Sequence, residues 1–97
     1  MASNLGTAEI DFGAWPGENE ASVTVTGQAE ITALASVEAW LMADDTTATH
    51  TAQDHRYAAA LMGLTCGTPT AGAGFTIYAR STEKLTGAFK VRWVWST

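Results

Sequence analysis

The chain has 97 residues and a mass of 10.2 kDa, a size for one domain, which we expect to cover residues 1–97. Its 10 acidic residues outnumber its 5 Lys and Arg residues, and the resulting net charge of −5 argues against nucleic-acid binding, because phosphate contacts need basic side chains. The single cysteine, Cys66, excludes an internal disulfide and a cysteine-based zinc site. The chain has no run of about 18 apolar residues, so we expect no membrane span, and residues 1–7 lack the features of a signal peptide.

Alternating apolar and polar residues in the first half predict β-strands. The alternation is clear over 8–12, where acidic residues separate the apolar ones, and again over 21–26. Pro followed by Gly at 16–17 predicts the turn between these two strands. Residues 29–33 are compatible with a short continuation or an edge strand, and 36–43 alternate again.

The middle of the chain has no clear period. Residues 44–55 are polar and irregular, and Thr51 followed by Asp54 resembles a capping box, so we expect a single helical turn near 51–56. Residues 57–65 combine an alanine run, which favours a helix, with an alternation that fits a strand. We predict a strand there, because the segment is short and its neighbours are strand-like.

The last third contains the strongest strand signals. Three glycines and a proline within 66–74 predict a compact turn, and 74–80 alternate as a strand. A polar connection is expected over 81–86, and 87–95 alternate aromatic and aliphatic residues with basic ones. Short strands separated by frequent turns predict an all-β fold, an antiparallel β-sandwich of about six to seven strands.

The charges divide unevenly along the chain. Residues 1–55 carry nine acids and no Lys or Arg, whereas residues 56–97 carry five basic residues and one acid. Antiparallel pairing can mix the two halves within one subunit. Alternatively, copies or partners dock through edges of opposite charge.

The sequence offers no convincing catalytic or metal site. The metal-like residues cluster in one polar stretch: Asp44, Asp45, His50, Asp54 and His55. The two histidines are five residues apart and do not align on a helix, so we interpret the stretch as a Thr-rich loop with a helical cap and expect no metal or cofactor. No serine-hydrolase, zinc-protease or phosphate-loop motif is present, and Cys66 has no assignable base, so we do not expect an enzyme.

Aromatic residues give a stronger signal. Trp93 and Trp95 share a strand face with other apolar residues and are expected in the core, whereas Trp40 and Met42 lie on the opposite face of their strand from its aliphatic residues. A strand that is apolar on both faces must be covered on both. The second face is then a subunit interface or a sugar-stacking platform. The candidate interface or glycan-binding residues are Trp15, Trp40, Met42, Tyr78, Arg80 and Arg92.

Four segments carry a resemblance to a known family. They are 10–17 (Ile-Asp-Phe-Gly-Ala-Trp-Pro-Gly), 21–27, 74–80 (Gly-Phe-Thr-Ile-Tyr-Ala-Arg) and 91–95 (Val-Arg-Trp-Val-Trp). Together they resemble a family of small tailed-bacteriophage proteins encoded among virion genes. The last third is also similar in plan to H-type lectin domains, which are six-stranded antiparallel sandwiches that assemble as trimers and hexamers. The fold expected on these grounds is H-type-lectin-like or jelly-roll-like.

The phage resemblance implies a virion component that acts by assembly. We expect a head decoration or cement protein that forms a homotrimer and contacts other virion proteins, assembled in the host cytoplasm and resident in the virion. The alternative is a tail- or fibre-associated adhesin that binds a host surface glycan through Trp or Tyr stacking. Neither reading involves nucleic acid or a membrane.

Overall fold

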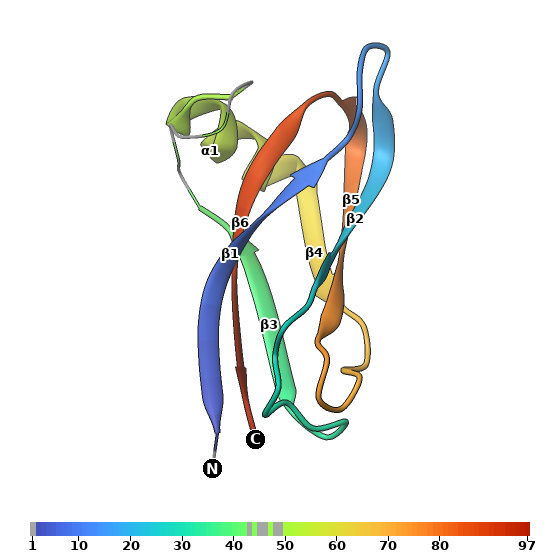
Figure 1. Cartoon of the computed structure of the whole chain (residues 1–97). Coiled ribbons are helices and arrows are strands. Elements are labelled where there is room, and N and C mark those ends of the chain that lie inside the picture. The colour runs from blue at the N-terminus through green and yellow to red at the C-terminus, as the bar shows by residue number, and fades with distance from the viewer. Residues whose placement is uncertain (1, 43, 45–46, 48–49) are drawn as a thin grey trace.

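The computed structural model describes residues 2–42, 44, 47 and 50–97 and consists of six strands and one helix (Figure 1). The strands form two three-stranded antiparallel sheets, β1-β6-β3 and β2-β5-β4, arranged as a β-sandwich. The all-β prediction is therefore confirmed. The one described helix is too short to cross a bilayer. In chain order the elements are β1 (Ser3–Asp11), β2 (Glu18–Val25), β3 (Ser36–Leu41), α1 (Ala52–Leu61), β4 (Met62–Cys66), β5 (Phe75–Leu85) and β6 (Ala88–Ser96).

The core lies between the two central strands. β5 passes directly into β6 through a corner at Thr86 and Gly87, where Gly87 adopts a φ of 76° that is readily available only to glycine. Because every second residue of a strand points to the same face, both strands send an unbroken row inward. These inward side chains are all buried: Phe75, Ile77, Ala79, Ser81, Phe89, Val91, Trp93 and Trp95.

The two core tryptophans depend on small or polar neighbours. Trp93 lies opposite Gly6 in the β1–β6 register, and its indole occupies the space where a Cβ at Gly6 would stand. The Nε1–H of Trp95 donates to Oε1 of Gln28, 3.0 Å away, which fixes the loop after β2 against β6. The predicted core position of both tryptophans is confirmed.

Strand pairing mixes the acidic and basic halves of the chain. β1 and β3 pair with β6, and β2 pairs with β5, so each of these strands from the acidic half lies beside one from the basic half. Glu9 stands opposite Lys90, and Glu20 stands opposite Arg80. The interpretation that the charges mix within one subunit is supported by this register.

One prediction of secondary structure is wrong. Residues 57–65, predicted as a strand, continue the helix α1 as far as Leu61, and only then does β4 begin. The capping box is present, since the Asp54 N–H donates to the Thr51 hydroxyl and the Thr51 N–H donates to the Asp54 carboxylate, each over 3.2 Å. A capped N-terminus followed by three alanines therefore outweighs the short alternation.

Three boundaries also differ from the predictions. Residues 81–86, predicted as a polar connection, belong mostly to β5, which extends to Leu85 and pairs there with Glu18 after a bulge in β2. Residues 29–33 form turns instead of a strand, with Ile31 N–H bonded to the Gln28 carbonyl. β1 begins at Ser3, five residues before the predicted strand, because Asn4 and Gly6 at alternate positions of this extension carry no apolar signal.

Candidate interaction surfaces

The outer face of the β1-β6-β3 sheet carries three of the six predicted interface residues. In the register, Leu5 and Glu38 flank Val94, and Trp40 lies beside Arg92. Leu5 is 68% exposed and Trp40 is 39% exposed, although both are large apolar side chains. We call this surface, with Leu5, Glu38, Trp40, Met42, Arg92 and Val94, the β6 outer face.

Two charged side chains, Arg92 and Glu38, lie on the β6 outer face. Within the described residues, neither Arg92 nor Glu38 takes part in an ion pair. Exposed tryptophan, methionine and arginine are the residue types enriched at protein–protein interfaces. The face therefore has the composition of a protein-binding surface with a central cation.

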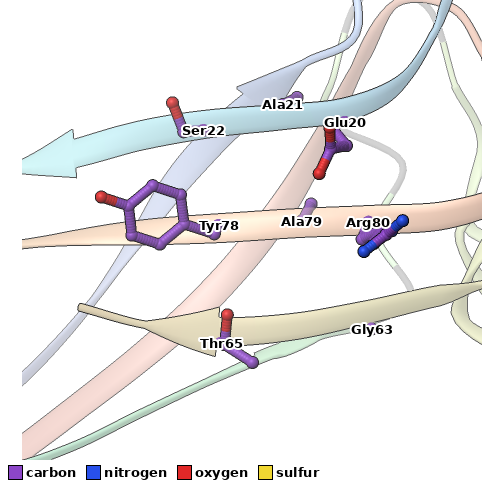
Figure 2. A pocket seen from close by; sticks show the side chains of 8 residues that line it. All are labelled: Glu20, Ala21, Ser22, Gly63, Thr65, Tyr78, Ala79 and Arg80. Carbon is purple, nitrogen blue, oxygen red and sulfur yellow. The ribbon is translucent and has the colours of Figure 1, made fainter.

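The outer face of the β2-β5-β4 sheet is an open depression of a different chemical character (Figure 2). Tyr78 stands in its centre, 51% exposed, with Ser22 on one neighbouring strand and Thr65 on the other. Its ring lies against Gly67, where a Cβ would come within 3.2 Å of the ring. An exposed aromatic ring between two hydroxyl groups can stack on an apolar face while the hydroxyls form hydrogen bonds.

A carboxylate and a guanidinium complete this depression. Glu20 and Arg80 are opposite one another in the β2–β5 register, and Gly63 follows on β4 with open space above it. Neither charged group forms an ion pair within the described residues. Both are therefore available to a ligand that offers hydroxyls or charges.

The predicted candidate residues thus divide between separate surfaces. Trp40, Met42 and Arg92 belong to the β6 outer face, and Tyr78 and Arg80 belong to the opposite sheet. Trp15 lies on neither, because it occupies the turn between β1 and β2, where it is 87% exposed. The sequence did not show that these residues lie on separate surfaces.

A third surface was missed in the sequence. Along the side of the sandwich where β3 and β4 are the edge strands, every inward-facing side chain is only partly buried. We call this row the β3–β4 seam, and it consists of Val37, Ala39, Leu41, Met62, Leu64 and Cys66. Alternation identifies such residues as inward-facing, but only the strand order shows that no further strand covers them.

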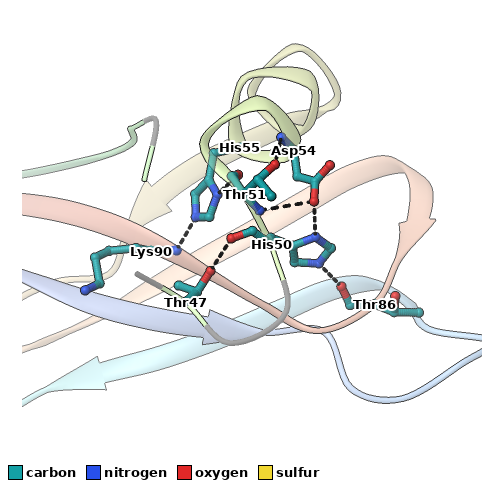
Figure 3. A network of polar contacts seen from close by, with 7 residues as sticks. All are labelled: Thr47, His50, Thr51, Asp54, His55, Thr86 and Lys90. Carbon is teal, nitrogen blue, oxygen red and sulfur yellow. Dashed lines mark hydrogen bonds and ion pairs between the residues drawn. The ribbon is translucent and has the colours of Figure 1, made fainter. Parts of the chain in front are cut away.

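The histidines of the predicted polar cluster attach the segment before α1 to β6 (Figure 3). The His50 ring stacks on Phe89 with centroids 4.0 Å apart and an interplanar angle of 10°. Its Nε2 lies 2.6 Å from the Thr86 carbonyl oxygen, and its Nδ1 lies 3.3 Å from the Asp54 carboxylate. His50 is thus used to hold the helix start against the β5–β6 corner.

His55 is fully buried and has both ring nitrogens bonded. Its Nδ1 donates to the Thr51 carbonyl oxygen over 2.8 Å, and its Nε2 accepts the backbone N–H of Lys90 over 2.9 Å. Nε2 therefore holds α1 on β6, Nδ1 is bonded at the start of the same helix, and neither nitrogen is directed at a ligand.

The described residues contain no group of three His, Cys, Asp or Glu side chains placed to hold a metal ion. Asp45, one member of the predicted cluster, lies outside the described residues. Burial raises the pKa of the Cys66 thiol, and the nearby Glu38 carboxylate raises it further, so little thiolate is present near pH 7. Cys66 thus lacks the activation that a nucleophile needs.

Comparisons with known proteins add no relative: no family model, no curated protein and no solved structure matches the chain.

Replacing His55 tests the attachment of α1. His55→Leu should lower the free energy of unfolding by about 1–3 kcal/mol, because the buried N–H of Lys90 loses its acceptor. His55→Gln, whose amide oxygen can accept the same N–H, should cost less. Urea denaturation measures both, with exposed Gln53→Leu as the control; equal stability of the His55→Leu variant and the native chain would contradict the role assigned to the ring.

The helix cap predicts a dependence of stability on pH. The pKa of Asp54 is held below its ordinary value of 3.8, chiefly by the backbone N–H of Thr51 and then by the His50 side chain. A carboxyl group with a depressed pKa stabilises the fold above its ordinary pKa and loses that contribution as the pH falls through the folded-state value. Melting temperatures of the native chain and Asp54→Asn should therefore differ at about pH 5 and converge at about pH 2; a gap that widens in acid contradicts the assignment.

Proposed function

We propose that this chain is a structural protein of a bacteriophage virion, a head decoration or cement protein that acts by binding other protein copies. The observation that carries the proposal is the β6 outer face, where Leu5 and Trp40 are exposed around an Arg92 that has no ion pair within the described residues. Such a face favours a binding module over a chain that diffuses alone. The resemblance of four segments to small tailed-phage proteins supplies the virion setting.

Assembly also accounts for the physical properties of the chain. A protein that binds only the assembled lattice stabilises that lattice by mass action, and it needs no reactive groups. Both histidines are engaged in bonds inside the fold, and the pKa of Cys66 is raised. The described chemistry is therefore directed to packing and surface contact.

The experiment is a comparison of phage particles with and without the protein. Particles that lack it should lose their contents at a lower temperature, and adding the purified chain should restore the heat stability, with a copy number set by the lattice. Trp40→Ala should fail to restore it, because the β6 outer face loses its largest apolar side chain, whereas Tyr78→Ala on the opposite sheet should succeed. Absence of the protein from purified virions would overturn the proposal.

A second candidate function rests on the Tyr78 depression. A tail- or fibre-associated adhesin would bind a host glycan there, with the Tyr78 ring stacked on a sugar face and with Glu20 and Arg80 bonded to its hydroxyls. In this case Tyr78→Ala should abolish binding to host cells or to a glycan array, while Trp40→Ala leaves it unchanged. If the native chain binds neither host cells nor any glycan on the array, this candidate function is excluded.

A further inference from the structure

The β3–β4 seam is the least complete part of the sandwich. The inward residues of β5 from Phe75 to Ser81 and those of β6 are buried, but the inward residues of β3 and β4 are only partly buried along both strands. A groove at this side is lined only by apolar side chains, from β3, α1 and β4: Ala39, Trp40, Leu41, Ala59, Met62 and Leu64. The core is therefore less completely covered at this side.

The other side of the sandwich, where β1 and β2 are the edge strands, differs in the size of its partly buried side chains and in its charge. There the partly buried residues of β1 and β2 are mostly alanines, so little apolar area is exposed. The strands β1 and β2 also carry four acids and no basic residue: Glu9, Asp11, Glu18 and Glu20. β3 and β4 together carry one charged residue, Glu38.

This charge distribution selects what can cover the seam. Two copies of a chain with a net charge of −5 repel one another, most strongly where their acidic strands meet. The seam is where two copies approach with the least repulsion, and its uncharged lining matches only an uncharged apolar surface. The same seam on a second copy is such a surface.

The edge of β3 can also pair with another strand. β3 is bonded to β6 on one side in regular register, and within the described residues no backbone group pairs with its other side. It contains no proline and no bulge, which are the usual features that block strand addition. The bulge in β2 lies on the acidic side instead.

We propose that two copies of this chain associate through antiparallel pairing of β3 with β3 about a two-fold axis at Ala39. The pairing joins two three-stranded sheets into one six-stranded sheet and brings the two seams together, so that Val37 of one copy faces Leu41 of the other. The inference deepens the proposed function, on which its biological role rests, by naming a second copy as the partner. It replaces the threefold association implied by the resemblance with a twofold one.

Charge, the number of paired positions and the alternation of the strand together select the register. A two-fold axis at Glu38 would place the two carboxylates opposite one another, which destabilises a strand pair. An axis at Ala39 places Glu38 opposite Trp40 of the second copy and keeps five consecutive positions, 37–41, paired. Inward residues remain opposite inward residues, as the alternation of a strand requires.

The test begins with sedimentation of the full chain over a range of concentrations and salt. We expect a dimer whose dissociation constant falls as salt is raised, because screening weakens the repulsion between the two acidic copies. Trp40→Glu places two carboxylates opposite one another at two symmetric positions and should raise the dissociation constant at least about tenfold, with an unchanged circular dichroism spectrum. Tyr78→Glu, on the opposite sheet, is the matched control and should leave it unchanged.

Two further experiments test the pairing: a charge exchange and a disulfide crosslink. Adding Glu38→Lys to Trp40→Glu should restore the dimer, because opposite charges then face one another. Ala39→Cys in a Cys66→Ser background should form a disulfide-linked dimer on oxidation, since opposed residues in an antiparallel pair have Cα atoms about 4.5–5.5 Å apart. Thr24→Cys in the same background, on the acidic side, should form no disulfide-linked dimer.

The outcomes separate this inference from the proposed function. A monomer or a trimer in solution, or a missing Ala39→Cys crosslink, overturns the β3 pairing, even if the protein is present in virions. A dimer with the expected crosslink, together with absence from virions, supports the pairing and refutes the virion function.

Discussion

Four of the six strands are edge strands, and this constraint governs the molecule. A three-stranded sheet has one central strand, so two such sheets bury most of the inward faces of β5 and β6 and leave most inward residues of the other strands only partly covered. A domain of this size buries a smaller share of its surface than a larger one does. The stability of the fold is therefore concentrated in the β5–β6 pair, and the outer strands are available for contacts.

The polar residues that resemble a reactive cluster are used to stabilise one end of the sandwich. Phe89 on β6 contacts both histidine rings. His50 is bonded to the backbone carbonyl of Thr86, between β5 and β6, and His55 is bonded to the backbone N–H of Lys90 on β6. These contacts position α1, which connects β3 in one sheet with β4 in the other. A chain that crosses between sheets through a helix needs such an attachment, because α1 itself buries only His55 and Ala58.

The alternation of apolar and polar residues predicted the fold class, because it depends only on residues that are near one another in the chain. The central strands were easy to recognise, since Phe89 to Trp95 alternate along a fully buried face. The sequence did not predict helix α1 beyond its first turn, because its three alanines fit the period of a helix as well as that of a strand. Only the capping box at Thr51 favours the helix. The sites were harder, because Trp40 and Tyr78 look alike in sequence, and their separation on opposite sheets depends on strand order.

The distribution of charge over the edges explains how such a chain can associate without forming fibres. Open edges invite unlimited strand addition unless they are blocked. The acids of β1 and β2, together with the bulge in β2, make one side of the sandwich repel its own copies. With one side acidic and the other carrying only Glu38, the proposed β3 pairing uses the less charged edge and stops after a single addition, so the charge distribution limits what the β3–β4 seam can build.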